Sequence, residues 1–238
     1  MSADRLFADL RVLWHMLRGQ PGAGSHAQRL EAFYGPQAEH YDSFRARLLQ
    51  GRRELIERLA PPPGAHVVEL GCGTGANLAH FGEQLNRLGR VDLVDLCRPL
   101  LEQARRRTEI SGPVRVIEAD ACTYDPGQPV DCVYFSYSLT MIPDWRGALR
   151  NAHAMLRPGG RLAIVDFHLP AKGGLANGFW RRWFAHDGVL LSAEHLPLLR
   201  QMFPEHALEE RRAAIPYLPG LRVPYYLFVG SKPQSGAA

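Results

Sequence analysis

The chain has 238 residues, of which 46% are hydrophobic and 22% are charged. This length fits one large domain, and it is long enough for a core that needs neither a disulfide nor a metal for stability. The formal net charge of +4 is small, and no block rich in lysine and arginine stands out. A nucleic-acid partner is therefore not expected.

The cysteine pattern and the lengths of the apolar runs bear on where the protein works. None of the four cysteines forms a C-x-x-C pair, so we expect no disulfide framework, no zinc site and a reducing compartment. Asp4 and Asp9 interrupt the apolar N-terminal residues, and no small-residue cleavage site follows, which argues against a signal peptide. No apolar run approaches the ~20 residues that a membrane-spanning helix requires. The expected location is the cytoplasm, either free or peripheral on the inner face of the membrane.

The first quarter of the chain is predicted to be helical. Residues 1–18 place leucines and a tryptophan at helical spacing between arginines, which is typical of a short amphipathic helix. A stretch of glycine, proline and serine ends that pattern, and a second helical region runs over residues 26–59, with an interruption expected near Gly35. We expect residues 1–60 to form a helical cap that belongs to the same domain as residues 61–238.

Strands and helices alternate over the next hundred residues. Short apolar runs predict strands, and a helical pattern of about ten residues separates most of them. Such alternation implies right-handed crossovers and a parallel sheet with helices on both faces. An irregular, aromatic and helical insertion over residues 171–206 precedes two final strands that can close the sheet as a hairpin. The predicted strands cover residues 66–70, 91–96, 114–118, 130–135, 161–165, 207–214 and 225–230, and the predicted helices cover residues 76–88, 99–109 and 145–156. The predicted fold class is α/β, with a doubly wound, mostly parallel sheet of seven strands.

A glycine-rich loop follows the first predicted strand. Gly71, Gly73 and Gly75 come directly after that strand, where glycines let the backbone turn tightly and approach a ligand without Cβ collisions. A ligand at this place lies at the carboxyl edge of the sheet. Asp95 follows Gly75 by 20 residues, at the end of the second strand, where a carboxylate can accept hydrogen bonds from both hydroxyls of a ribose. These residues predict a nucleoside-binding site.

The spacing G-x-G-x-G, with Glu69 two residues before the first glycine, resembles the first motif of class I S-adenosylmethionine-dependent methyltransferases. The resemblance implies their Rossmann-like fold and S-adenosylmethionine as the cofactor. An acidic residue beside the loop suits a cofactor that carries an ammonium group and a sulfonium, and it would repel the pyrophosphate of a dinucleotide.

Other positions match the same family pattern. Asp120, which follows the third strand, corresponds to the residue that resembling enzymes use to hold the adenine amino group; a helix cap or a turn residue is the alternative. Residues 136–139, after the fourth strand, match the wall of the methyl-transfer chamber. The resemblance assigns cofactor binding to Tyr41, Glu69, Gly71, Cys72, Gly73, Gly75, Asn77, Asp95, Leu96, Asp120, Ala121, Ser136 and Tyr137.

A more specific likeness extends from about residue 9 to residue 231. Residues 33–42 (FYGPQAEHYD) and 136–144 (SYSLTMIPD), with shorter matches at 165–167, 183–184 and 223–226, resemble the methyltransferase half of betaine-lipid synthases. The resemblance implies three successive N-methylations of diacylglyceryl-homoserine at a membrane surface. Nothing in this chain resembles the half that makes the homoserine lipid, so the implied functional partner is a separate 3-amino-3-carboxypropyl transferase.

Methyl transfer to an amine requires positioning more than acid-base groups. The sulfonium is already activated, so rate comes from aligning the amine, the methyl and the sulfur and from excluding water. We expect Tyr41 to fold over the cofactor and Tyr137 or Ser138 to orient the amine, which makes these three the candidate catalytic residues. Tyr34 and Trp145 are further aromatic candidates for holding the cation that forms on nitrogen. Each aromatic residue could equally belong to the core, and no step requires a metal.

Two segments have a composition that suits a lipid surface. The N-terminal amphipathic helix carries a tryptophan and flanking arginines, and residues 179–184 interleave aromatic residues with arginines. The alternative is that both segments only cap the sheet and cover the site. His186 and Asp187 resemble a catalytic dyad, but adjacent residues on an irregular segment need not face each other. His195 and His206 have no ligand-like spacing with any cysteine.

Other functions remain open at this point. The glycine-rich loop is equally compatible with methylation of another small molecule or a quinone at carbon, nitrogen or oxygen. The chain could also be a non-catalytic regulatory subunit that binds S-adenosylmethionine, although the loop and residues 136–139 look intact. A nucleic-acid methyltransferase is not favoured, because no Asn-Pro-Pro-Tyr or Asp-Pro-Pro-Tyr motif follows the fourth strand.

Overall fold

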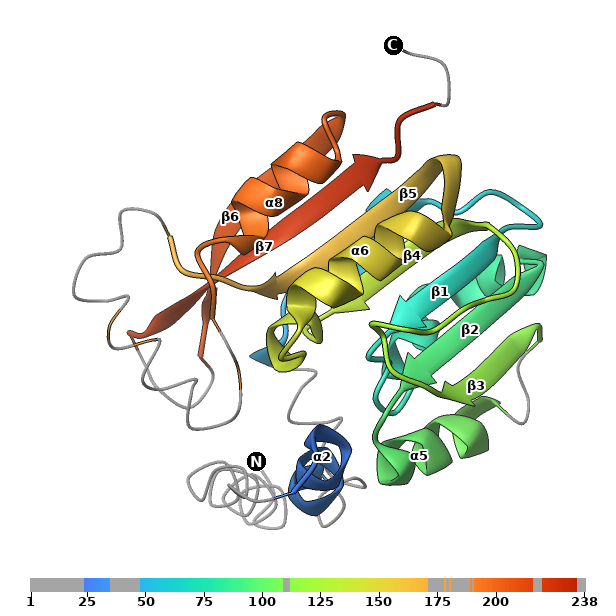
Figure 1. Cartoon of the computed structure of the whole chain (residues 1–238), viewed down its shortest axis with the longest axis horizontal. Coiled ribbons are helices and arrows are strands. Elements are labelled where there is room, and N and C mark those ends of the chain that lie inside the picture. The colour runs from blue at the N-terminus through green and yellow to red at the C-terminus, as the bar shows by residue number, and fades with distance from the viewer. Residues whose placement is uncertain are drawn as a thin grey trace.

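The computed structural model describes residues 24–34, 48–108, 112–170, 178, 180, 189, 191–215 and 220–234. Within these residues a seven-stranded sheet forms the centre of the molecule, in the order β3-β2-β1-β4-β5-β7-β6 (Figure 1). Its strands are β1 (His66–Leu70), β2 (Arg90–Asp95), β3 (Val114–Glu118), β4 (Val130–Ser136), β5 (Leu156–Phe167), β6 (His206–Ala214) and β7 (Arg222–Ser231). The helices are α2 (His26–Tyr34), α4 (Arg52–Leu59), α5 (Arg98–Thr108), α6 (Trp145–Met155) and α8 (His195–Met202), with short 3-10 helices η2 (Ala76–His80), η3 (Gly82–Arg87) and η4 (Leu139–Met141).

Six of the seven strands run parallel, and only β7 runs against them. β1 pairs in parallel with β2 and β4, and β4 pairs in parallel with β5, whereas β7 is antiparallel to both β5 and β6. The chain builds outward from β1 through β2 and β3, and then returns to add β4 and β5 on the other side of β1. The strand order therefore reverses at the carboxyl ends of β1 and β4, which is where open α/β sheets bind ligands. This topology confirms the predicted fold class.

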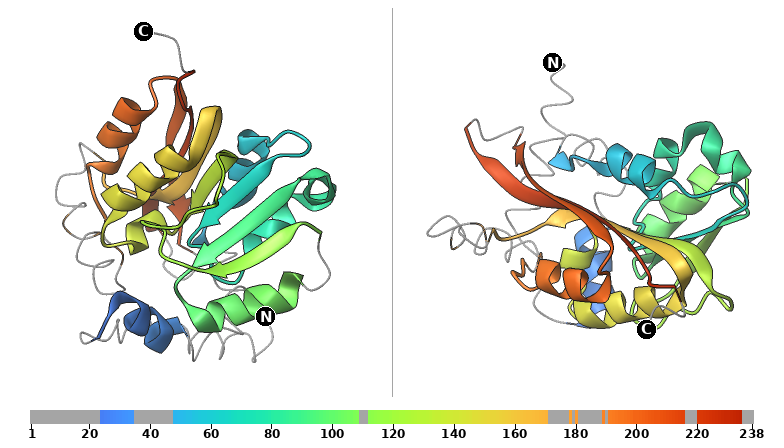
Figure 2. Two further views of the ribbon diagram at one scale, coloured as in Figure 1. Left: turned by 45° about the vertical axis from the view of Figure 1, so that its right-hand side comes forward. Right: turned by 90° about the horizontal axis from the view of Figure 1, so that it is seen from above.

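Helices cover both faces of the sheet (Figure 2). One core packs α4, η2, η3 and α5 against one face, and a second core packs α6 and α8 against the other. Successive residues of β1 divide between the two cores, since Val67 belongs to the first and Val68 to the second. Every residue of β1 is buried, as expected for a central strand covered on both sides.

Two predicted elements differ from the structure. The helix predicted over residues 76–88 is instead the pair η2 and η3, because Gly82 between them has a left-handed backbone (φ 54°) that an α-helix cannot contain. β5 begins at Leu156 rather than Arg161, because Leu156 pairs with Val130 ahead of a register shift between β4 and β5. Helix α6 accordingly ends at Met155.

The predicted helical cap lies only partly within the described residues. α2 packs through Leu30 against Cys97 and Leu100 at the start of α5, and α4 contributes Leu55 and Leu59 to the main core. The amphipathic helix predicted over residues 1–18 lies outside the described part of the chain, and the division at residue 60 stays a prediction. Of the helices in the described ranges, none combines the length and the apolar character needed to span a bilayer.

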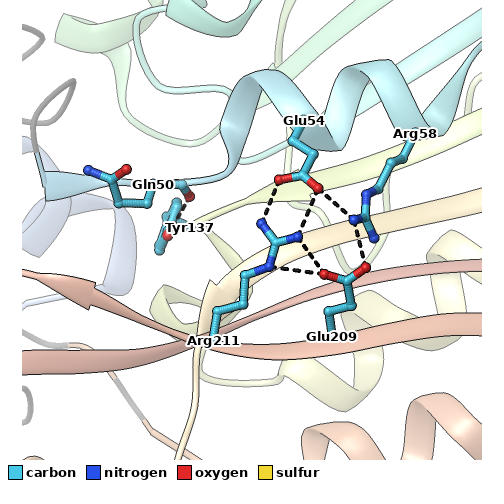
Figure 3. Close-up of polar contacts among 6 residues, drawn as sticks. All are labelled: Gln50, Glu54, Arg58, Tyr137, Glu209 and Arg211. Atoms are coloured by element: carbon cyan, nitrogen blue, oxygen red, sulfur yellow. Dashed lines mark hydrogen bonds and ion pairs between the residues drawn. The ribbon is translucent and has the colours of Figure 1, made fainter.

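Four charged side chains form ion pairs that link α4 to the edge strand β6 (Figure 3). Arg58 donates hydrogen bonds to Glu54 of its own helix (2.5 Å) and to Glu209 of β6 (2.6 Å). Arg211 of β6 donates to Glu54 (2.6 Å) and to Glu209. The four side chains are 30–44% exposed, so each ion pair adds little to the free energy of folding. Their geometry nevertheless fixes the position of α4, and the start of α4 lies beside the candidate active site.

Candidate active site

The glycine-rich loop leaves β1 at the carboxyl edge of the sheet, and its packing requires glycine at two positions. Gly71 has a left-handed backbone (φ 76°), and a Cβ atom there would lie 2.4 Å from the Cβ of Ser138. Gly75 also has a left-handed backbone (φ 68°), and a Cβ atom there would lie 3.0 Å from Cδ1 of Leu93. The loop therefore lies directly against the segment that follows β4 and against β2.

A cavity of about 280 Å³ lies beside the loop, where β1, β2, β3 and β4 end. It brings together most of the predicted site residues. Those that line it are Gly71, Gly73, Asp95, Leu96, Asp120, Ala121, Tyr137 and Ser138. The predicted residues that do not line it are Glu69, Cys72, Gly75, Asn77 and Ser136. Tyr41 lies outside the described residues.

Asp95 ends β2 and faces the cavity from beneath the loop. Its Oδ2 atom accepts a hydrogen bond from the Gly73 amide (2.7 Å), and its Oδ1 atom accepts one from the Cys97 amide (2.8 Å). An ionised carboxylate has about four acceptor positions, so these two bonds do not exhaust its capacity. The carboxylate therefore holds the loop in place and still suits the predicted contact with ribose hydroxyls, which stays a prediction.

Asp120 and Asp144 add two more carboxylates to the cavity wall. Asp120 accepts a hydrogen bond from the Cys122 amide (2.8 Å), so it is also the turn residue that the sequence allowed as an alternative. Asp144 caps α6 by accepting from the Gly147 amide (2.8 Å). Three carboxylates around one cavity favour a cationic ligand over a pyrophosphate.

Glu69 lies beneath the loop, not in the cavity wall, and it is fully buried. It accepts hydrogen bonds from the amide of Asn77 (2.6 Å) and from the hydroxyl of Tyr134 (2.6 Å). Burial raises the pKa of its carboxyl to about 7, against the lowering effect of both hydrogen bonds. In this structure Glu69 fixes the underside of the loop, and its predicted contact with the cofactor's ammonium group stays a prediction.

Glu69→Gln should change how stability depends on pH. Because the pKa of Glu69 is raised from an ordinary 4.5 to about 7, the folded protein holds a proton there between these pH values that the unfolded chain releases. The parent's free energy of unfolding therefore falls as pH rises through this window, and glutamine removes that contribution. Between pH 5 and pH 8 the variant should gain roughly 1–3 kcal/mol relative to the parent, measured by chemical denaturation. The exposed Glu83→Gln is the control; parallel curves for the parent and Glu69→Gln would contradict the expectation.

Tyr137 and Ser138 both line the cavity, and the hydroxyl of each bonds to the backbone. Tyr137 has a left-handed backbone (φ 55°), which is rare outside glycine and clusters at functional sites. Its hydroxyl donates to the carbonyl of Gln50 just before α4 (2.7 Å, Figure 3), and its ring lies 4.7 Å from that of Phe167. The Ser138 hydroxyl donates to the Leu70 carbonyl (2.6 Å). Because each hydroxyl donates its proton to the backbone, its oxygen can take part in a further hydrogen bond only as an acceptor.

Trp145, a further aromatic candidate, does not line the cavity. Trp145 is buried against His195, with 4.4 Å between ring centroids, and belongs to the core between the sheet and α6. Trp180, the one tryptophan of the insertion that is described, is also buried in a core. The side chain of Tyr34 lies outside the described residues, as do His186 and Asp187. In the described ranges no group of three or more histidine, cysteine or acidic side chains could hold a metal ion.

Arg52, to which no sequence motif assigns a role, lies beside the loop in the structure. Its guanidinium donates to the side-chain carbonyl of Asn77 (3.4 Å), and the amide nitrogen of Asn77 in turn donates to Glu69. A guanidinium at this place suits the carboxylate of an amino-acid ligand. No spacing in the sequence points to it, because residue 52 reaches the loop only through the packing of α4.

The comparisons with known proteins agree with this geometry. A family model described as a methyltransferase domain matches residues 41–214, and the chain belongs to that family. The fold is that of class I enzymes, and the chain is an S-adenosylmethionine-dependent methyltransferase. The glycine-rich loop, Asp95 and the acidic cavity wall fit this cofactor, which supplies an activated methyl group on sulfonium.

Named relatives and a solved structure show which methyltransferases the chain is similar to. The chain is 28% identical over 176 residues to 2-phytyl-1,4-naphtoquinone methyltransferase of Thermosynechococcus vestitus, covering 71% of this chain and 77% of the relative. It is 33% identical over 111 residues to the ubiquinone/menaquinone biosynthesis C-methyltransferase of an Enterobacter species, covering 45% of this chain and only 44% of the relative. The solved phosphoethanolamine N-methyltransferase 2 of Haemonchus contortus, in complex with phosphomonomethylethanolamine and S-adenosylhomocysteine, superposes with a TM-score of 0.70 at 15% identity, covering 89% of this chain and 61% of that one.

Proposed function

We propose that the chain N-methylates the amine of diacylglyceryl-homoserine three times and so forms a betaine lipid. The observation that supports this proposal most strongly is the segment 136–144, which we call the acceptor wall. Its sequence resembles the corresponding segment of betaine-lipid synthases, and its residues Tyr137, Ser138 and 141–144 line the cavity beside the loop. The partners in this proposal are the lipid at a membrane surface and a separate 3-amino-3-carboxypropyl transferase that makes it.

The residues of the acceptor wall suit an amine. The amine attacks only as the neutral base, and its remaining N–H groups need acceptors near the methyl group. The hydroxyl oxygens of Tyr137 and Ser138 supply acceptors, and the carboxylate of Asp144 offers compensation for the positive charge that forms on nitrogen. Met141, Ile142 and Pro143 give the same wall an apolar surface that excludes water.

A direct assay tests the proposal. The purified chain is incubated with S-adenosylmethionine labelled in its methyl group and with synthetic diacylglyceryl-homoserine in anionic vesicles. We expect lipid products with one, two and three labelled methyl groups, and sedimentation of the protein with the vesicles. Formation of S-adenosylhomocysteine without label in the lipid would contradict the proposed acceptor, and protein that stays in the supernatant would contradict the proposed membrane contact.

Tyr137→Phe should lower turnover more than cofactor affinity. The change removes the hydroxyl that bonds to Gln50 and faces the acceptor, but it leaves the ring against Phe167. We expect kcat to fall roughly tenfold and the Kd for S-adenosylhomocysteine to change less than about threefold. Tyr124→Phe is the control, because it removes a similar buried hydrogen bond, to Asp92, from a tyrosine that does not line the cavity. Initial rates give kcat, and calorimetry gives the Kd for S-adenosylhomocysteine. Equal losses of kcat in both variants would show that Tyr137 has no special role at the acceptor site.

A second candidate is methylation of a quinone or another small molecule. The observation that favours it is the similarity to the naphtoquinone methyltransferase, which spans most of both chains. A carbon acceptor needs a base to remove its C–H proton, whereas an ammonium group can lose its proton to water before each methyl transfer and needs no dedicated base. Incubation with a demethylated naphthoquinone in place of the lipid separates the two candidates, and label in the quinone alone would favour the second.

A further inference from the structure

A buried carboxylate lies directly behind the acceptor wall. Asp166, near the end of β5, is fully buried. Its Oδ1 atom accepts hydrogen bonds from the Thr140 hydroxyl (2.7 Å) and from the Phe167 amide (2.8 Å), and its Oδ2 atom accepts from the Thr140 amide (3.1 Å). Thr140 itself is buried at 1% exposure. Three donors thus converge on one carboxylate, and two of them belong to the acceptor wall.

The surroundings of Asp166 do not compensate its charge. In the described part of the chain no arginine, lysine or histidine forms an ion pair with it, although burying an unpaired carboxylate is costly. Tyr226 of β7, its register partner, is fully buried. His168, directly after β5, and His195 of α8 are also buried. We therefore expect that the buried carboxylate of Asp166 acts on the conformation of the acceptor wall, to which it is hydrogen-bonded.

The position of Thr140 shows which part of the acceptor wall depends on these hydrogen bonds. Thr140 lies in η4 between Ser138 and Met141, and both of these line the cavity while Thr140 faces the opposite way. The hydrogen bonds from Thr140 to Asp166 therefore set how far Ser138 and Met141 extend into the cavity. We propose that Asp166 and Thr140 are positioning residues for the methyl acceptor, because their hydrogen bonds hold the acceptor wall in the form that receives it. This inference rests on the role of the acceptor wall in the proposed function.

Among Asp166 and the described titratable groups around it, Asp166 is the one whose charge changes near neutral pH. Burial raises the pKa of Asp166 to about 6. Burial lowers the pKa of His195 to about 4, with Arg146 of α6 adding to the effect, and burial lowers the pKa of His168 despite the opposing Glu210 of β6. Burial raises the pKa of Tyr226, so its phenol stays neutral. Below pH 6 Asp166 gains a proton, and it then accepts fewer hydrogen bonds from the acceptor wall.

Substitutions that keep volume test the proposal. Asp166→Asn keeps the size, but its amide nitrogen cannot accept the backbone amides of Thr140 or Phe167. Thr140→Val removes only the hydroxyl, and Thr140→Ser restores it. With S-adenosylmethionine saturating, we expect kcat/KM for the acceptor to fall roughly tenfold or more in Asp166→Asn and roughly threefold to tenfold in Thr140→Val, with Thr140→Ser close to the parent. The Kd for S-adenosylhomocysteine should change less than about threefold in all three.

The pH profile distinguishes positioning from a purely structural role. The ratio of kcat/KM between Asp166→Asn and the parent should approach one below pH 6 and diverge above it, and the titration of the amine cancels in this ratio. A ratio that is constant with pH, or equal activity of Thr140→Val and Thr140→Ser, would overturn the proposal. A parent chain that methylates a different acceptor would instead contradict the proposed function, and the same variants are then compared with that acceptor.

Discussion

Gly71→Ala is expected to abolish tight cofactor binding while leaving the chain folded. The added Cβ would lie 2.4 Å from the Cβ and 2.9 Å from the Oγ of Ser138, so the glycine-rich loop and the acceptor wall must separate. Overpacking of this kind costs about 1–3 kcal/mol, in addition to about 1–2 kcal/mol for a left-handed alanine. Since both displaced segments line the cavity, we expect the Kd for S-adenosylhomocysteine to rise at least about a hundredfold.

A matched glycine separates the collision from the backbone strain. Gly64 has nearly the same backbone (φ 77°), but a Cβ atom there would meet nothing within 4 Å. Gly64→Ala should therefore be destabilised only by the strain of a left-handed alanine. Its affinity for S-adenosylhomocysteine should equal that of the parent. Adding Ser138→Gly to Gly71→Ala removes the colliding atoms and should restore part of the affinity. Calorimetric titration and chemical denaturation of the three variants check this. Cofactor affinity in Gly71→Ala equal to that in Gly64→Ala would show that the loop does not hold the cofactor.

The sequence was sufficient for the sheet and for the parts of the site that lie at strand ends. Buried parallel strands are short apolar runs, and a loop after such a strand must lie at the carboxyl edge. For that reason Asp95, Asp120, Gly71 and Gly73 could be placed at one cavity from the sequence alone. The prediction failed for residues 76–88, where apolar spacing suggested one helix and a single left-handed glycine divides it.

Contacts between distant segments could not be predicted in the same way. Tyr137 bonds to a carbonyl 87 residues away, and Arg52 reaches Asn77 because α4 packs on the sheet through Leu55, Ile56 and Leu59. Asp166 ends an apolar strand, and nothing in its spacing indicates that Thr140 is its partner. These contacts depend on how elements pack, and they decide the shape of the acceptor side, whereas the cofactor side follows from local motifs.

The second large effect is expected for Asp95→Asn. An asparagine has one oxygen acceptor, and the amides of Gly73 and Cys97 already require two. The variant therefore loses a bond that holds the loop and also the charged acceptor for the ribose hydroxyls. Hydrogen bonds to a charged group contribute about 1.5–3 kcal/mol each, so the Kd for S-adenosylhomocysteine should rise by roughly a hundredfold or more. Asp125→Asn is the control, because Asp125 is exposed and accepts a similar bond from the Gly127 amide (2.8 Å) away from the cavity.

An analogue without a ribose hydroxyl separates the two losses. In a double-mutant cycle, removing the hydroxyl from the ligand should weaken binding to the parent but have much less effect on Asp95→Asn, because the acceptor for that hydroxyl is already gone. If Asp95 only held the loop, the hydroxyl would matter equally in both proteins. A coupling energy of zero would therefore reassign Asp95 from the ligand to the loop, even if Asp95→Asn binds the whole cofactor poorly. The coupling term, rather than the affinity loss alone, is the measurement on which the ribose contact depends.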